Sequence, residues 1–465
     1  MSTEIPGPPG IPILGNIFDV NPNETWSSLN KLASKYGPIF KINVLGNQLV
    51  FICSVALLDE ICDQTRFRKC VKGPVVEIRY SVHDSLFTAD NDDKNWGVAH
   101  RIMMPLLTKE ATDSVYNDMM EVVPDLTRKW SAGTKQRVKA SDDLDLILLA
   151  SCMKCFFNER VHVLGEKDET QKKAWAMVEA WEGATMEALK RPNRPKPLNW
   201  LYQGRFSAFT KTMRNYATDI VNRRKNNSEL ARKDMMDALL NGVDPESGLK
   251  LTDSQVVDEI ISIFIGAATA ANLLTYAVYY LSNNPEALKK GQDEIDSVVG
   301  EGPIDLSHLK QLNYVEAILR ETIRLSAAAP GFNIEPIPRK DKKDKTPVLL
   351  GGGEYQIPYD QPMLAILSAV NRDPAVFEDP LAFKPEQVIG DKWDKLPAAA
   401  KKGFGNGKRE CIGKLWAWQW SFFTLASILK DVTFELEDPN YELQVNGAFS
   451  IKPMDMYVLM SGRRK

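Results

Sequence analysis

The sequence predicts a mainly α fold with a minor β portion, continuous over residues 1–465 as a single domain. Apolar residues recur with helical spacing over most of residues 95–330 and again over 412–430. Within that region, residues 260–285 carry no charged side chain, which is typical of a helix buried on every side. Alternating apolar patterns with turn residues are confined to about 38–53 and 348–370, so the β portion should be small.

The composition is that of an ordinary globular protein. Apolar residues make up 44% and charged residues 26%, and the formal net charge is −3, which argues against disorder and against a nucleic-acid partner. Six cysteines are too few for a disulfide-stapled secreted scaffold, so we expect a reducing compartment. The first residues show no secretory signal, and Pro6, Pro8 and Pro9 exclude a helical start.

The first half of the chain should contain one β-hairpin followed by helices. Residues 38–53 predict two strands with a turn at Gly46-Asn47. Helical periodicity then predicts helices over 95–107, 112–130, 143–157, 170–189 and 206–224. Pro192, Pro195 and Pro197, interleaved with basic residues, predict an extended polar connector, which is a surface loop or, less favoured, a mobile entrance loop.

The second half should begin with the long apolar helix, capped by Thr252 or Asp253 and stopped at Asn284-Pro285. Its uncharged stretch is long enough to cross a bilayer, but polar residues and Gly266 interrupt it, so a buried helix is favoured. The remaining predictions are helices over 286–299, 313–325 and 412–429, a hairpin over 348–357, a strand over 362–368, little periodicity over 373–402, and short strands at the end.

A glycine-rich loop around one cysteine is the sharpest local feature. It reads Phe-Gly-Asn-Gly-Lys-Arg-Glu-Cys-Ile-Gly over residues 404–413 and leads into a predicted helix. The N–H groups and dipole of a helix N-terminus stabilise a thiolate, and glycines allow a flat ligand to approach the backbone. Arg409 could pair with an anionic group of such a ligand. The alternative is a structural cysteine in a tight turn.

This loop resembles the haem-binding loop of the cytochrome P-450 family, F-x-x-G-x-R-x-C-x-G, at every specified position. The resemblance implies that Cys411 is the proximal thiolate ligand of the iron of haem b, iron protoporphyrin IX. It also implies that Phe404 packs under the haem, that Arg409 binds a propionate, and that Trp96 and His100, an i,i+4 pair, donate to propionates. The full set of haem-contacting residues that it implies is Lys69, Trp96, His100, Phe404, Arg409, Cys411 and Gly413.

A second motif, E-x-x-R at Glu321 and Arg324, matches the buried structural pair of the same family. An acid–base pair at this spacing is common on helix surfaces, so alone it means little. Gln387 stands where the family's P-E-R-F element usually places the arginine that joins this network. Since charged networks are not obligatory for stability, we expect an unchanged fold with a locally altered network.

Within the family, the chain resembles the haem domains of soluble self-sufficient fatty-acid hydroxylases of bacteria and fungi, in which a flavin reductase is fused C-terminally. The matching strings include Leu86-Phe87-Thr88, Lys94-Asn95-Trp96 and residues 240–245. The resemblance implies a flavoprotein partner that uses FMN, FAD and NADPH. It also implies a cytoplasmic protein without a transmembrane segment, unless an N-terminal anchor was removed. The chain is then either cut from such a fusion or a stand-alone relative.

The central helix departs from the family pattern beside the expected iron. Thr269 matches the proton-relaying threonine, but Ala268 replaces the acid that precedes it, and the segment is one residue shorter than in the relatives. Because a bulge is an inserted residue, this deletion should straighten the helix there. The Thr269 hydroxyl then either hydrogen-bonds oxygen or bonds back to the preceding turn.

The residues expected at the substrate-binding end of the site also depart from the family pattern. Asn47 and Phe51 stand where the hydroxylases place an arginine and a tyrosine that anchor the substrate carboxylate, so a simple free fatty acid is not the expected substrate. Other matching positions imply an apolar pocket. They are Phe87, Ala329, Gly331 and Phe449.

The main functional hypothesis is a haem-thiolate monooxygenase that oxidises a small hydrophobic molecule with dioxygen. The alternative is a haem-thiolate enzyme that does not activate dioxygen, of the isomerase, dehydratase or nitrogen-oxide type, which Ala268 and the shortened helix motivate. A carrier of haem or lipid without catalysis is the least favoured interpretation.

Overall fold

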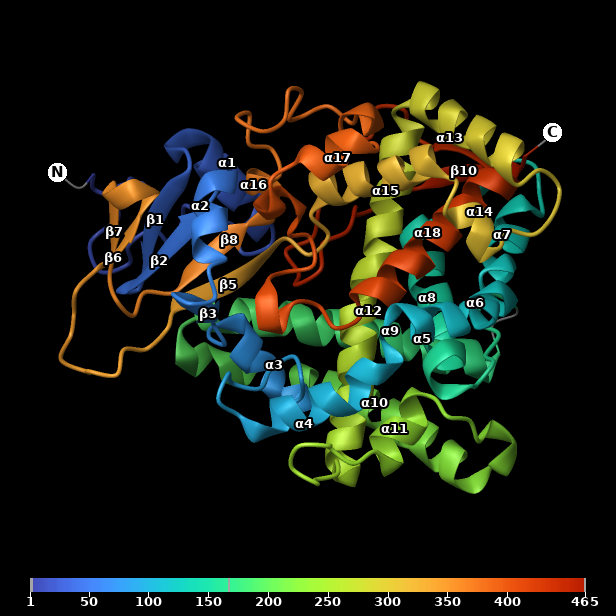
Figure 1. Cartoon of the computed structure of the whole chain (residues 1–465), viewed down its shortest axis with the longest axis horizontal. Helices are drawn as coiled ribbons and strands as arrows, with labels where there is room; N and C mark the ends of the chain where they lie inside the picture. Colours follow the sequence, from blue (N-terminus) through green and yellow to red (C-terminus); the bar gives the residue numbers. More distant parts are fainter. Residues whose placement is uncertain (1–2, 166–167, 464–465) are drawn as a thin grey trace. The chain divides into compact units, whose positions relative to one another are not determined.

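The computed structural model describes residues 3–165 and 168–463, and its contacts divide the chain into two compact units (Figure 1). The sheet unit comprises Met1–Lys72, Arg320–Cys411 and Val445–Ile451. The helical unit comprises Gly73–Leu319, Ile412–Gln444 and Lys452–Lys465. Helices dominate and the sheets are small, which confirms the predicted mainly α fold class.

The sheet unit is built on five strands in the order β1-β2-β8-β5-β3. They are β1 Ile39–Val44, β2 Asn47–Ile52, β8 Met363–Ile366, β5 Gly331–Pro336 and β3 Phe67–Lys69, all antiparallel neighbours except β2 and β8. The β1–β2 turn lies at Leu45 and Gly46, both with positive φ, one residue earlier than the predicted Gly46-Asn47 turn. The predicted second hairpin is β6 Val348–Leu350 and β7 Tyr355–Ile357.

Short helices complete the sheet unit. They are α1 Thr25–Tyr36, α2 Val55–Ile61, the end of α15 Asn313–Ser326, α16 Leu367–Val370 and α17 Asp391–Lys395. Helix α1 was not predicted from the sequence, although its buried residues Trp26, Leu29 and Ala33 follow a helical spacing. Few apolar residues in a short segment gave too weak a pattern.

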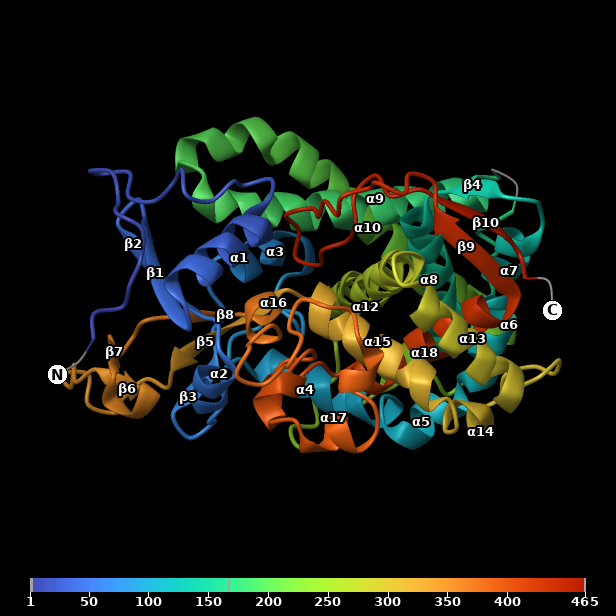
Figure 2. The ribbon, with the colours of Figure 1, turned by 90° about the horizontal axis from the view of Figure 1, so that it is seen from above.

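The helical unit places its elements around the long helix α12 Asp253–Ser282. Its other helices are α3 Pro74–Val82, α4 Lys94–Met103, α5 Lys109–Ser114, α6 Tyr116–Val122, α7 Pro124–Ser131, α8 Ala140–Phe157, α9 Glu169–Lys190, α10 Trp200–Asn226, α11 Met235–Asn241, α13 Pro285–Val298, α14 Leu306–Leu309 and α18 Lys414–Asp431. A small sheet contains β4 Gln136–Val138, β10 Val458–Gly462 and β9 Val432–Leu436. Helices α8, α10 and α18 pack on α12, and α9 lies beside α10 (Figure 2).

Helix α12 begins as predicted and runs without interruption. The Thr252 side chain accepts from the backbone N–H of Gln255, whose own side chain accepts from the Thr252 backbone, so a capping box fixes the start. Every residue of α12 is α-helical, in line with the expected straightening. Among the described residues it is the one helix long and apolar enough to cross a membrane, and 67% of its apolar window is buried.

Two sequence predictions were wrong in detail. The helix expected over 112–130 is three helices, α5, α6 and α7, because α7 starts at Pro124, which has no N–H to continue the preceding helix. The expected extended connector forms two 3-10 turns, Arg191–Asn193 and Lys196–Asn199, and α10 starts at Trp200 rather than at 206. Prolines at the first positions of such turns fit their fixed φ.

Candidate functional site

The cysteine loop of the sheet unit is held by backbone hydrogen bonds. The Cys411 N–H donates to the Phe404 carbonyl at 2.9 Å, and the Glu410 N–H donates to the Gly407 carbonyl at 2.9 Å. Gly405 and Gly407 have φ of +86° and +61°, a region that favours glycine. A Cβ at Gly407 would lie 2.2 Å from the Gln64 side chain, so the close approach also requires glycine.

Side chains tie this loop to the segment after α2. Asn406 donates from Nδ2 to the Cys62 carbonyl at 2.8 Å and accepts from Lys402 Nζ at 2.7 Å. The Lys408 N–H donates to Gln64 Oε1 at 2.8 Å. Phe404 and Arg409 are half-buried, and Gly413 forms the N-cap of α18. The loop is therefore fixed before any ligand contributes.

Exposure separates Cys411 from the other five cysteines, all of which lie in the described chain. Cys411 is exposed, whereas Cys53, Cys70, Cys152 and Cys155 are buried and Cys62 is intermediate. Burial raises the pKa of the Cys62 thiol to about 11 and that of Cys70 to about 12, and raises those of the remaining three further. Since a metal ligand must be a thiolate, Cys411 is the cysteine suited to that role.

Two basic side chains lie close to each other in the sheet unit. Burial, and then repulsion from the Arg409 guanidinium, lowers the pKa of Lys69 to about 7. Such a pair of cations fits a ligand that brings a carboxylate. Together with the exposed Cys411 in its glycine loop, this donor set fits a haem with its iron and propionates.

The helical unit contributes Trp96 and His100 from α4. Asp93 caps this helix, since its carboxylate accepts from the Asn95 N–H at 2.8 Å. The i,i+4 spacing stacks the Trp96 and His100 rings with centroids 4.9 Å apart. Trp96 is buried and His100 is half-buried, so one helix face presents both ring N–H groups in a fixed arrangement.

Glu321 and Arg324 form a fully buried pair. Arg324 donates from Nε and Nη2 to the two Glu321 oxygens at 2.7 and 2.8 Å. The Arg324 Nη1 also donates to the carbonyls of Asn371 and Pro380. Gln387 donates from Nε2 to Glu321 Oε1 at 2.8 Å, which is the locally altered network expected from the sequence.

Around the middle of α12, the helix exposes one narrow face. Ala268 is buried, Thr269 is half-buried and Gly266 is exposed. Apart from the neighbouring backbone of α12, no described atom lies within 4 Å of the position that a Gly266 Cβ would take. The back-bonded arrangement is seen at Thr275, which donates to the Ala271 carbonyl at 3.0 Å, whereas no described residue accepts from or donates to the Thr269 hydroxyl.

The residues expected around the substrate belong to both units. In the sheet unit, Asn47 is exposed at the start of β2, and Phe51 is buried with its ring stacked on Phe40 at 4.7 Å. A Cβ at Gly331 would lie 2.3 Å from the Ala365 carbonyl, so close strand pairing alone requires this glycine. The other two residues of this unit, Ala329 and Phe449, are half-buried. Phe87, in the helical unit, is 37% exposed.

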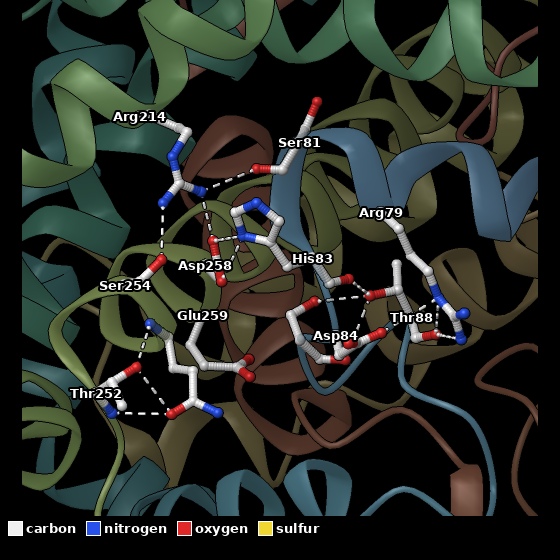
Figure 3. Close-up of polar contacts among 12 residues, drawn as sticks. Arg79, Ser81, His83, Asp84, Thr88, Arg214, Thr252, Ser254, Asp258 and Glu259 are labelled. Atoms are coloured by element: carbon white, nitrogen blue, oxygen red, sulfur yellow. Dashed lines mark hydrogen bonds and ion pairs between the residues drawn. The ribbon is translucent and has the colours of Figure 1, made fainter.

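A charged cluster at the start of α12 was not predicted from the sequence (Figure 3). Asp258 forms ion pairs with His83, whose Nδ1 lies 3.0 Å away, and with Arg214 of α10. Glu259, next to Asp258, is buried and accepts from the Leu86 N–H at 2.9 Å. The signal available in the sequence was the pair of adjacent acids, Asp258 and Glu259, in a mainly apolar helix. Their partners are distant in the chain, so the pattern did not indicate them.

The chain is similar to known proteins over almost its whole length. The family model described as cytochrome P-450 matches residues 5–460. The chain is 35% identical over 466 residues to a bifunctional cytochrome P-450/NADPH–P-450 reductase of Acremonium egyptiacum, covering 98% of the chain and 43% of the relative. It is 35% identical over 452 residues to a self-sufficient cytochrome P-450 monooxygenase of Penicillium freii, covering 97% and 42%. The chain thus spans about two fifths of the length of these relatives.

Proposed function

Because this chain belongs to the cytochrome P-450 family, we propose that it is the haem domain of a monooxygenase that oxidises a small hydrophobic molecule with dioxygen. The observation that carries the proposal is Cys411, the exposed cysteine in a backbone-fixed glycine loop. Cys411 would ligate the iron, Phe404 would pack beside the sulfur, and Lys69, Arg409, Trp96 and His100 would hold the propionates. Gly413 would leave room for the macrocycle. When bound, the haem supplies the redox chemistry of dioxygen.

Electrons for this reaction would come from NADPH through a flavoprotein reductase with FMN and FAD. The support is that two relatives are named bifunctional cytochrome P-450/NADPH–P-450 reductases and are more than twice as long as the part matched. A cytoplasmic location fits the six cysteines, no two of which form a disulfide.

The proposed substrate is apolar and lacks a free carboxylate. Asn47 carries no charge, and the buried ring of Phe51 offers no hydroxyl to a carboxylate. Phe87, Ala329, Gly331 and Phe449 would leave the pocket apolar. The dioxygen-independent alternative is not favoured by the relatives reported above, which are named as monooxygenases or reductase fusions.

Two measurements test this function. The reduced protein with carbon monoxide should give the Soret band typical of thiolate-ligated haem, and Cys411→Ala should lose it; a band that survives in Cys411→Ala contradicts the ligand assignment. Oxidation of a hydrophobic probe such as dodecanol should require dioxygen and an electron donor. Product formed anaerobically without a donor would contradict the monooxygenase proposal.

A further inference from the structure

A polar cavity of about 80 Å³ lies at the start of α12, wholly within the helical unit. Its wall combines exposed side chains with the buried Glu259, so the cavity leads from solvent to that carboxyl group. The lining residues are His83, Asp84, Ser85, Asn95, Leu251, Gln255, Asp258 and Glu259.

Glu259 is 2% exposed, and one of its oxygens has no partner. Oε1 accepts from the Leu86 N–H, whereas Oε2 is buried without a hydrogen bond to any described residue. Burial raises the pKa of Glu259 to about 8, with a further increase from the adjacent Asp258 that the Leu86 N–H opposes. The Glu259 side chain is therefore a protonated carboxylic acid at neutral pH, and it can donate this proton.

The neighbouring cations are bound to Asp258 rather than to Glu259. Asp258 lies between the His83 ring and the Arg214 guanidinium, which also donates to Ser254 Oγ at 3.2 Å (Figure 3). The remaining charged residue of the cavity wall is Asp84, which is exposed. The Asp84 carboxylate lies 3.6 Å from Arg79 Nε, so Asp258 is the charge that favours the neutral form of Glu259.

A chain of hydroxyl groups starts at the cavity wall. Ser85, the neighbour of Leu86, lines the cavity together with Glu259. The Ser262 hydroxyl donates to Ser85 Oγ at 2.8 Å, and Ser85 Oγ lies 3.3 Å from Thr88 Oγ1. Each hydroxyl can both donate and accept, so the chain can pass a proton when the groups rotate.

The helix itself leads from Ser262 to Thr269. Ser262, Gly266 and Thr269 are spaced i, i+4 and i+7, which places them on one face over a rise of about 10 Å. Along this face Gly266 is exposed and Ser262 and Thr269 are half-buried. Apart from the neighbouring backbone of α12, no described atom lies near the Gly266 Cβ position, so a chain of several waters can connect the two hydroxyls.

We propose that Glu259 supplies protons through Ser85 and Ser262 to the Thr269 hydroxyl, in place of the acid that Ala268 lacks. The inference rests on the proposed monooxygenase function. The O–H bond of Glu259 breaks as one forms on a water in the cavity, which gives up one of its own protons to Ser85. Each hydroxyl then passes on its own proton, and solvent in the cavity returns a proton to the carboxylate. No electron moves in this relay, and one proton travels from solvent to Thr269.

The first experiment uses the holoenzyme with a reductase, NADPH and dodecanol as the probe. Glu259→Gln removes the acid, yet its amide oxygen still accepts from the Leu86 N–H, and Ser262→Ala interrupts the chain. The product formed per NADPH should fall about 10-fold or more in both variants and stay unchanged in the control Asp84→Asn. An unchanged amount of product per NADPH in Glu259→Gln would overturn the inference.

Oxidation driven by hydrogen peroxide provides a control, because peroxide brings its own protons. Its rate should be equal in the wild type and Glu259→Gln. An equal loss of the peroxide-driven and the NADPH-driven oxidation in Glu259→Gln would indicate structural damage. It would contradict a proton relay from Glu259.

The second readout is the infrared C=O band of a protonated carboxyl group, which needs no turnover. The wild-type holoenzyme should show a band that disappears as the pH rises through 8 and that is absent in Glu259→Gln. Absence of the band in the wild type overturns the inference whatever the activity. A wild type that shows the band but never oxidises dodecanol with dioxygen contradicts the proposed function instead.

Discussion

Gln387 donates its side-chain amide to Oε1 of the buried Glu321 across 2.8 Å, at the position where the family's motif places an arginine. The same oxygen accepts from the Lys384 N–H at 2.8 Å and from Arg324 Nη2 at 2.8 Å. The network therefore pairs one carboxylate with one guanidinium and replaces a second cation with a neutral donor.

This arrangement predicts unequal costs for removing its members. Gln387→Ala removes one of several donors and should lower the free energy of unfolding by about 1 kcal/mol. Glu321→Ala leaves the Arg324 charge buried and should cost about 3–5 kcal/mol. Denaturant titration measures both, and equal costs would contradict this account of the network.

The pH dependence of stability should reveal the cation pair at Lys69. Because the folded pKa is lowered from 10.5 to about 7, the unfolded chain binds more protons between these values. The free energy of unfolding of the haem-free protein should therefore rise with pH across that window. Lys69→Met should remove this rise relative to the wild type, and identical slopes would contradict the lowered pKa that burial, and then Arg409, gives Lys69.

In contrast to Lys69, Glu259 should make the free energy of unfolding fall with increasing pH. Its pKa rises from 4.5 to about 8 on folding, so the folded chain holds the extra proton between these values. The free energy of unfolding should fall as the pH rises through the window, and Glu259→Gln should flatten that fall. Thermal unfolding of the wild type, Glu259→Gln and the control Asp84→Asn at a series of pH values measures this fall. An equal fall in the wild type and Glu259→Gln would contradict the prediction.

A new acid beside Thr269 should rescue a broken relay. In the Glu259→Gln background, Ala268→Glu places a carboxyl group next to Thr269 in sequence and should restore most of the lost product per NADPH. In the wild type the same change should give little gain. A large gain in the wild type without rescue of Glu259→Gln would show that Glu259 does not supply the protons.

Charge at Asn47 should control the preference for a substrate carboxylate. Asn47→Arg introduces a cation at an exposed position and should strengthen binding of dodecanoate by about 5-fold, near 1 kcal/mol, while binding of dodecanol stays constant. Spectral titration of the holoenzyme with dodecanoate and with dodecanol measures the ratio of the two affinities. Equal changes in both affinities would argue against a role for position 47 in anchoring a carboxylate.

The sequence predicted the parts of the site that are contiguous or lie one helical turn apart. The loop around Cys411, the Glu321–Arg324 pair and the stacked Trp96 and His100 all belong to this class. The cluster of Asp258 with His83 and Arg214 joins residues 175 and 44 positions apart, and no local pattern carries such a contact.

Boundaries of elements were predicted less well than their existence. A single periodic stretch over 112–130 concealed the break at Pro124, since apolar spacing continues across it. The short helices α1 and α2 are stabilised mainly by packing of a few residues, which intrinsic propensity does not reveal.

The hydrogen bond from Asn406 to the Cys62 carbonyl joins positions 344 residues apart. Contacts of such long sequence separation form late, because loop closure must be completed before they contribute. During synthesis, the cysteine loop therefore cannot reach its final shape until Asn406 has emerged from the ribosome. Haem insertion would follow the formation of this contact, so the two distant segments must meet before the thiolate can be offered to iron.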